Sequence, residues 1–346
     1  MLAEHRALRL AIAAALALAT AYGLAIPLPF LAPVFVVILS TMPGPPMGAK
    51  ALLVLVLVMC LGLGSGLLLI PMLAYYPVTA ILTVALGLFL AMYITLILGK
   101  RVPGMFLTIG FTLISVAGTV DYLLAITVIQ SLALALIIAV VCQWVVYPFF
   151  PELPGATPAP EAAQGPEPSA WFALRAALIV LPAYLLALTN PSQYLMTIMK
   201  SVSLGQQSSM LDARHAGREL IGSTFVGGIM AVLFWVALKV NPTLWMFFLW
   251  MLAFGLYASA RLYRARPSSF APSFWVNALV TMLILLGPAV EDSANGNDAA
   301  SAFAMRFVTF VAVTFYAWGA LYLLEYWRSR RLGRAAMRGR AVTASR

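Results

Sequence analysis

Residues 122–148 read YLLAITVIQSLALALIIAVVCQWVVYP, an unbroken apolar run without a charged side chain. About 20 such residues are enough for one helix to cross a bilayer. Similar runs recur along the chain, in which 63% of the 346 residues are apolar and only 9% are charged. Soluble domains carry roughly a quarter charged residues. The composition therefore predicts an all-α, polytopic membrane protein with almost no room for a globular domain outside the bilayer.

Proline, glycine and charged residues divide the chain into about twelve expected spans, six in each half. Two spans of the first half are short and bounded by proline, so they are candidates for half-spanning or tilted helices. These are the second, 29–42, and the fifth, 103–118. The other expected spans are 7–25, 50–70, 77–98, 122–148, 171–189, 192–205, 218–239, 242–263, 270–288 and 301–326.

The two halves repeat one another about 165 residues apart. Ala7-Leu8-Arg9 at the start of the first span corresponds to Ala173-Leu174-Arg175, and Pro77 corresponds to Pro242. An even number of spans in each half predicts parallel repeats, related by an axis along the membrane normal. We expect a first six-helix repeat in 1–150, a Pro/Ala/Glu linker in 151–170, a second six-helix repeat in 171–327 and a basic tail in 328–346.

The basic residues predict the orientation. With the N-terminus in the cytoplasm, the inner face receives nearly all of them, and the outer loops receive Lys239 together with four acidic residues, which is a strong positive-inside pattern. The net charge of +10 therefore indicates a cytoplasmic membrane face and not a nucleic-acid partner. The inner residues are Arg6, Arg9, Lys50, Lys100, Arg101, Arg175, Arg214, Arg218, Arg261, Arg264, Arg266 and the seven arginines from Arg328 to Arg346.

Three places carry charges that could serve a transport site. Lys200 lies in a short apolar segment, where it either faces a cavity or partner or reaches the interface along its own stem. Arg306, one turn inside the outer leaflet, either pairs with the acidic residues of the preceding loop or offers a guanidinium to a carboxylate. Asp121 is expected to cap a helix in an outer loop.

The third place is the polar stretch 200–228. On a helix, Asp212, His215 and Glu219 share one face, with Arg214 and Arg218 beside it. Such a cluster either passes protons or holds an anion at the cytoplasmic mouth, or it is a solvated loop helix with surface ion pairs. We take Lys200, Arg214, His215, Arg218 and Arg306 as candidate substrate-binding residues, and Asp212 and Glu219 as candidate proton-coupling residues.

Small residues cluster in matching spans of the two halves, at 62–66 and 222–228. They predict close helix packing, although Ser223 and Thr224 are also able to line a polar path. The chain has no Gly-rich phosphate loop, no HExxH pair and no nucleophile elbow. We therefore expect no enzyme activity, no cofactor and no metal site.

These features together resemble a known pattern. The repeated Ala-Leu-Arg start, the basic residue that opens the third span of each half (Lys50 and Arg218) and the run REL-IGSTFVG at 218–227 are similar to the fusaric acid resistance and aromatic acid exporter superfamily of bacterial inner-membrane proteins. The resemblance covers nearly the whole chain. It implies two six-helix halves, an inner-membrane location and proton-driven efflux of aromatic carboxylic acids or similar toxic anions, with a periplasmic adaptor protein and an outer-membrane channel as partners.

The chain departs from the larger exporters in one respect. They carry a sizeable cytoplasmic domain between the halves, whereas here the linker is only about twenty residues long. The sequence thus resembles a compact branch of the superfamily. Our expectation is an exporter of small amphipathic organic anions in the bacterial inner membrane, with both termini cytoplasmic and homo-oligomerisation left open. Two alternatives remain: a non-transporting subunit that anchors or assembles an efflux complex, and an intramembrane enzyme, against which the missing catalytic motifs count.

Overall fold

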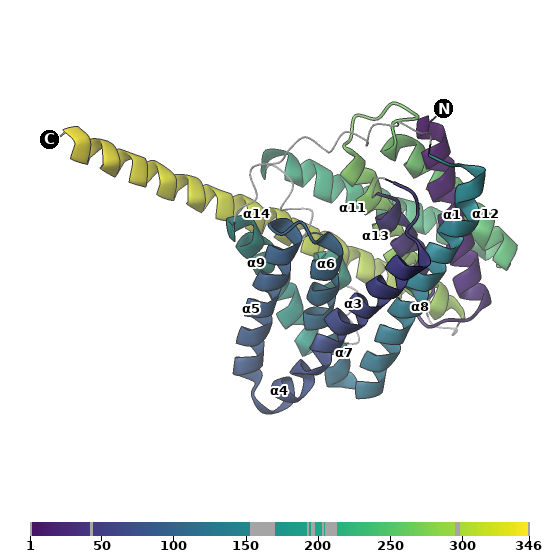
Figure 1. Cartoon of the computed structure of the whole chain (residues 1–346), viewed down its shortest axis with the longest axis horizontal. Helices are drawn as coiled ribbons and strands as arrows, with labels where there is room; N and C mark the ends of the chain where they lie inside the picture. Colours follow the sequence, from purple (N-terminus) through teal and green to yellow (C-terminus); the bar gives the residue numbers. More distant parts are fainter. Residues whose placement is uncertain are drawn as a thin grey trace.

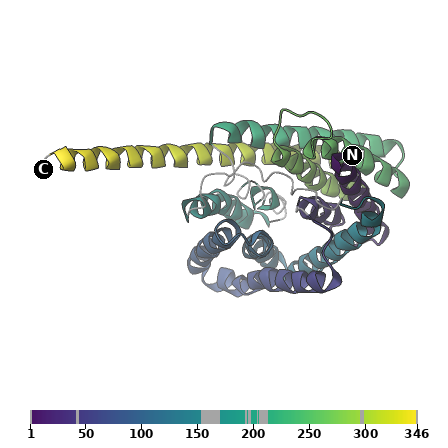
Figure 2. The same cartoon turned by 45° about the horizontal axis from the view of Figure 1, so that its top comes forward.

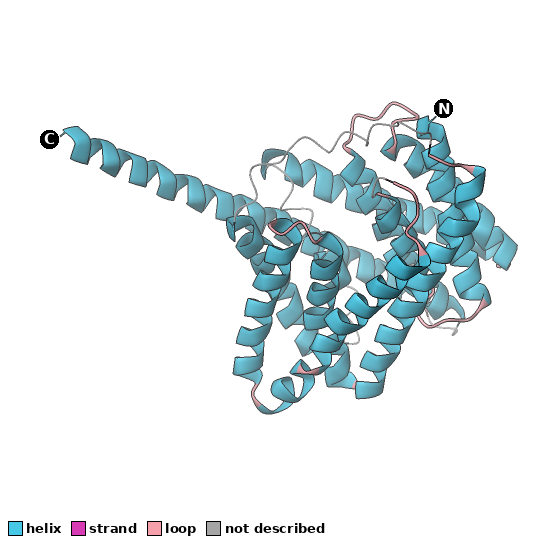
Figure 3. Cartoon of the chain, in the orientation of Figure 1, coloured by secondary structure: helices cyan, strands magenta, loops and turns pink. Residues whose placement is uncertain are grey.

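The structure is a computed structural model that describes residues 2–41, 44–152, 170–191, 194, 198–202, 204, 213–294 and 298–344. At 213–218, 294, 299, 329 and 331–344 it describes the backbone alone. The described residues form helices and connecting turns without a strand (Figure 3). Most of the expected linker and residues 205–212 of the polar stretch lie outside these residues.

The helices follow the expected spans closely (Figure 1). Ten of the described helical stretches are long and apolar enough to cross a membrane, and an eleventh, α2, is apolar but has only 10 residues. This confirms the prediction of an all-α, multi-pass membrane protein. The first half comprises α1 (Leu2–Gly23), α2 (Leu31–Ser40), α3 (Ala49–Leu67), α4 (Leu69–Tyr75), α5 (Pro77–Leu96), α6 (Arg101–Ile109), the π-helix η1 (Gly110–Ile114), α7 (Ser115–Val120), α8 (Tyr122–Val146) and the 3-10 turn η2 (Tyr147–Phe149). The second comprises α9 (Ala170–Thr189), α11 (Ala213–Val240), α12 (Leu244–Leu262), α13 (Pro272–Ala294) and α14 (Ala299–Ala344).

Three boundaries differ from the expectation. The fifth span is not short, because Pro103 lies in the first turn of α6, where its missing N–H is not needed, and the helix continues through η1 and α7 to Val120. The third span is interrupted at Leu68, one turn before Pro71, which cannot donate to the carbonyl four residues earlier. The last span does not end at Trp327 but continues through the basic tail, so that α14 projects far beyond the bundle (Figures 1 and 2).

Helix packing is alike in the two halves. The first helix of one half packs against the fourth helix of the other half, so that α1 lies along α12 and α9 lies along α5 (Figure 1). Within each half the third helix packs against the fifth, as α3 does against α6 and η1, and as α11 does against α13. This exchange of partners is the arrangement expected of halves related by a two-fold axis.

The fifth helix is the most enclosed of the long described helices in each half. The buried share of its most apolar window is 61% for Arg101–Val120 and 83% for Pro272–Ser293, higher than in any other long span of the same half that the structure describes. The short helix α2 is also enclosed, with eight of its 10 residues buried. Other long helices expose broad apolar faces, as α3 does at Leu53 and Leu61, which suits contact with lipid. Chemistry between the helices therefore centres on the two fifth helices.

Glycines bring the third and fifth helices into backbone contact. A Cβ on Gly66 would lie 2.0 Å from the carbonyl oxygen of Gly110, and a Cβ on Gly110 would lie 2.2 Å from the carbonyl oxygen of Gly62. In the second half a Cβ on Gly227 would lie 2.5 Å from the carbonyl oxygen of Ala278. The packing role predicted for both small-residue clusters is thus confirmed at these positions.

Equivalent ion pairs link the ends of each six-helix set. Arg6 and Arg9 on α1 both bond Glu152, which follows the last helix of the first half, with shortest N–O distances of 2.7 Å. In the second half Arg175 on α9 bonds Glu325 on α14, with an N–O distance of 2.6 Å. We call these pairs the two clasps and their side of the bundle the basic end. Each clasp holds the first and sixth helices of its half together.

Candidate functional site

The side chain of Lys200 is completely buried inside the helix bundle. Its Nζ donates to Oδ1 of Asn277 at 3.2 Å and to Oγ1 of Thr281 at 2.7 Å, and both acceptors lie on α13. No acidic group among the described residues forms an ion pair with it. The structure thus decides between the alternatives in favour of a buried lysine with neutral partners, and not one that reaches the interface.

The hydrogen bonds around this lysine run in one direction. Asn277 Nδ2 donates to Ser223 Oγ on α11 at 2.5 Å, and Ser223 Oγ donates to the carbonyl of Leu220 at 3.1 Å. Thr281 Oγ1 donates to the carbonyl of Asn277 at 2.6 Å, so its oxygen is left to accept from Lys200. Every side-chain donor atom in this buried cluster therefore has at least one acceptor.

The cluster belongs to a polar ladder between α11 and α13. Ser273 donates to Glu219, and Asn277 donates to Ser223, so both rungs join residues 54 apart in the sequence. Gly227 faces Thr281 at the same offset, with only 2.8 Å between an added Cβ and the threonine Cβ. The two helices are thus parallel and in constant register, and the ladder leads from Glu219 toward Lys200 in steps of one helical turn.

This site lies well inside the expected bilayer. Asn277 and Thr281 follow the start of α13 at Pro272, at the basic end, by about 8 and 14 Å at 1.5 Å of rise per residue. α13 is also the most enclosed span of the described chain. A lysine at this depth costs about 2.5–3.5 kcal/mol on insertion scales, and intramembrane charges of this kind mark ion or substrate pathways.

The equivalent position in the first half carries no charge. Phe35 on α2 lies 165 residues before Lys200 and packs on Phe106, with ring centroids 6.3 Å apart. Thr112 in the π-helix matches Asn277, and its Oγ1 bonds the carbonyl of Thr108 at 2.7 Å. The helix arrangement is thus repeated in the two halves, whereas the lysine is present at this position only in the second half.

The other candidate residues stand as follows. Arg306 on α14 bonds Asp292 at the end of α13, with an N–O distance of 2.5 Å, which is the acidic-loop pairing considered from the sequence. Asp121 accepts from the N–H of Leu123 at 3.0 Å and caps α8, as predicted. Glu219 accepts from Ser273. Arg214, His215 and Arg218 belong to the first turns of α11, where only the backbone is described, and Asp212 lies outside the described residues.

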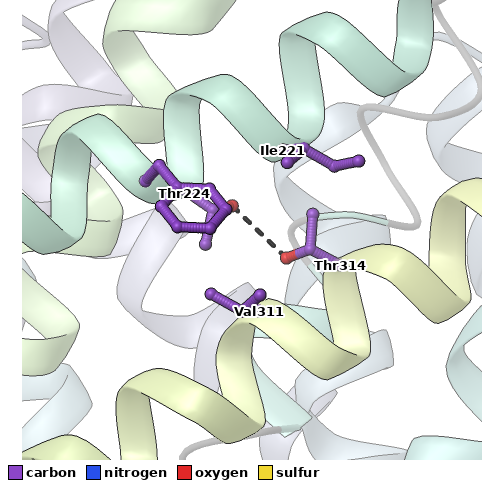
Figure 4. Close-up of a pocket in the computed structure, with 5 residues that line it drawn as sticks. Ile221, Thr224, Val311 and Thr314 are labelled. Atoms are coloured by element: carbon purple, nitrogen blue, oxygen red, sulfur yellow. Dashed lines mark hydrogen bonds between the residues drawn. The ribbon is translucent and has the colours of Figure 1, made fainter.

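A small hollow lies between α11 and α14 (Figure 4). Its walls are Ile221, Thr224, Phe225, Val311 and Thr314, and the two threonine hydroxyls lie 3.3 Å apart across it. The hollow has about 110 Å³ of space between atoms, open solvent included, and none of this space is wide enough for a water molecule. It serves helix packing, so the candidate site is the lysine cluster.

Asn277 and Thr281 were not singled out from the sequence. Asn277 is the one amide side chain in the expected span 270–288, and an amide in lipid-embedded helix is a polar signal comparable to a charge. Its partnership with Lys200, 77 residues away, depends on the packing of α13. Ser223, noted in the sequence as a residue able to line a polar path, is part of the cluster.

Comparison with known proteins gives one family. Residues 6–146 match a family described as a protein of unknown function (DUF2955). The match begins in α1 and ends with α8, so it covers the first six-helix set and stops before the lysine cluster. No curated protein and no solved structure matches the chain.

Proposed function

We propose that the protein is a membrane carrier that exports small amphipathic organic anions such as aromatic carboxylic acids. The observation that carries this proposal is Lys200, a fully buried lysine whose described partners are the neutral side chains of Asn277 and Thr281. Such a lysine lacks the counter-charge that a buried cation needs, and a substrate carboxylate would supply it.

The surroundings suit an anion with an apolar body. The amide of Asn277 accepts from Lys200 and carries N–H groups that are able to donate to carboxylate oxygens, and Ser223 lies beside this amide. Aromatic side chains lie about one turn before Asn277 in the sequence, where Phe274 in the first turn of α13 stacks on Phe270 with ring centroids 4.1 Å apart. The site thus combines polar and aromatic groups, as an aromatic acid would require.

The repeated scaffold supports a carrier mechanism. The two halves exchange partners through α1 with α12 and α5 with α9, so a rocking of one half against the other would expose α13 to alternate sides. In this proposal Lys200 is the substrate contact and Glu219, one step along the ladder, lies on the route from the basic end. Arg214, His215 and Arg218 near the start of α11, with Asp212 before them, would attract the anion or pass protons at that mouth, and Arg306 lies at the opposite end.

The basic end is cytoplasmic in this proposal, since Arg9, Arg175 and Arg261 all lie there. The membrane would be a bacterial inner membrane, and a periplasmic adaptor protein with an outer-membrane channel would complete the export route, as in the exporters that the sequence resembles.

The test is efflux of a panel of radiolabelled aromatic and aliphatic carboxylic acids from cells with and without the protein. We expect faster efflux of at least one aromatic acid, and loss of the increase in Lys200→Met at equal protein level. Unchanged efflux of every acid in the panel would contradict the carrier and favour a subunit that only assembles an efflux complex.

A further inference from the structure

The number of acceptors around Lys200 bears on its charge when no anion is bound. Among the described residues its Nζ has two hydrogen-bond acceptors, Oδ1 of Asn277 and Oγ1 of Thr281. A neutral amine has two N–H groups, whereas an ammonium has three. These two acceptors satisfy both N–H groups of a neutral amine, and the described residues offer no acceptor for the third proton of an ammonium.

The charges near the lysine do not change this conclusion. α13 carries no titratable side chain between Pro272 and Val290. On α11 the titratable groups with described side chains are Glu219, held by Ser273 at the neighbouring rung, and Lys239 at the far end. On α9 Tyr184 is close to Ser115 Oγ, at 3.4 Å, and on α14 the ion pairs of Arg306 and Glu325 lie near opposite ends of the span.

We propose, on the basis of the proposed function, that Lys200 takes up one proton when an anion binds, so that the carboxylate and the proton cross the membrane together. A carboxylate within hydrogen-bond distance of Nζ supplies both the negative charge and the third acceptor that an ammonium needs. The amine lone pair forms a new N–H bond with a proton from water on the side from which the anion enters. The site then holds an ammonium–carboxylate pair with no net charge.

The relative direction of proton and anion movement follows from the thermodynamic linkage between anion binding and protonation of Lys200. If the anion favours protonation of Lys200, protonation favours the anion by the same factor. Proton and anion therefore move in the same direction, and net export follows the gradient of the acid itself. This replaces the expectation of proton-driven efflux, because exchange of the anion for an incoming proton would require the two to exclude one another at the site.

The experiment is titration calorimetry of the purified full-length protein with benzoate, salicylate and 4-hydroxybenzoate. Each titration is run at the same pH in two buffers of different ionisation enthalpy, which gives the number of protons taken up on binding. We expect about one proton for each anion bound, and an affinity that falls by up to about tenfold for each unit of rise in pH. Binding without proton uptake would overturn the coupling and leave the carrier function in place, whereas absence of binding and of flux for all three acids would overturn both.

Two variants identify the side chain that takes up the proton. Asn277→Asp keeps the shape of the side chain but places a carboxylate beside Nζ, so Lys200 is already charged; we expect no proton uptake and at least tenfold weaker benzoate binding. Glu219→Gln removes the other titratable group of the ladder and leaves Lys200 in place. Proton uptake that persists in this variant assigns the proton to Lys200, and its loss would assign the proton to Glu219 and overturn the proposal.

Discussion

Arg175 on α9 donates to Glu325 on α14 at 2.6 Å, in the position where Arg9 donates to Glu152 in the first half. Arg9 and Arg175 lie within the first two turns or so of the first helix of their halves, at matching points of the sequence repeat. Glu152 follows the sixth helix of the first half, and Glu325 lies on the sixth helix of the second half. The clasps were not predicted, because an acidic residue 143 or 150 positions away gives no local signal.

The first prediction concerns Glu152. The hydrogen bonds from Arg6 and then Arg9 lower the pKa of this carboxyl, although its own burial acts in the opposite direction. A lowered pKa in the folded state adds stability that is present above the ordinary glutamate value of about 4.3 and is lost as the pH falls through the folded value. We expect Glu152→Gln to cost about 1–2 kcal/mol near neutral pH, since the pair is partly exposed.

Thermal unfolding in detergent from pH 7 to pH 3.5 measures this effect. The difference between wild type and Glu152→Gln should shrink as the pH falls below the glutamate range. A difference that stays constant through that range would show that the charge of Glu152 does not stabilise the fold.

A second prediction concerns the contact between α3 and η1. Gly66→Ala places a methyl group 2.0 Å from the carbonyl oxygen of Gly110, which forces two backbones apart. We expect a loss of stability of about 1–3 kcal/mol or more. Gly64→Ala is the matched control on the same helix, because nothing lies within 4 Å of its added Cβ. Equal melting temperatures for the two variants in detergent would contradict the close approach of these helices.

The third prediction concerns the hydrogen bond between Lys200 and Asn277. Asn277→Leu removes an acceptor from Nζ and the donor to Ser223, so we expect it to cost about 1–2 kcal/mol. In Lys200→Met/Asn277→Leu both partners are replaced by apolar groups, and most of the loss should be recovered. Melting temperatures of the two single variants and the double variant give the coupling. Strictly additive losses would mean that the two side chains do not interact in the membrane.

Most of the fold could be predicted from the sequence, because apolar runs, prolines and basic residues act locally. The span 122–148 was expected almost as α8 forms it, and Asp121 caps this helix as its position suggested. The length of the fifth span was wrong, since Pro103 looked like a boundary but lies in the first helical turn, where proline is tolerated. The continuation of α14 past Trp327 was also missed, because its arginines and alanines favour helix outside the membrane as well.

The candidate site could be predicted only in part. Lys200 was recognisable because a charge in an apolar segment is costly wherever the segment packs. Its partners Asn277 and Thr281 depend on the rotation of α13 about its axis and on the parallel register with α11, which are tertiary properties. No periodicity in a uniformly apolar helix reveals which face turns toward a lysine 77 residues away.

The measurement that tests the central claim most directly is flux of labelled benzoate, salicylate and 4-hydroxybenzoate in vesicles that contain the purified protein alone. Wild type is compared with Lys200→Met and with Gly64→Ala as a folded control. The account predicts flux of at least one acid through wild type and Gly64→Ala, and a loss of tenfold or more in Lys200→Met. Equal flux through Lys200→Met and wild type, or no flux through wild type for any of the acids, would contradict it.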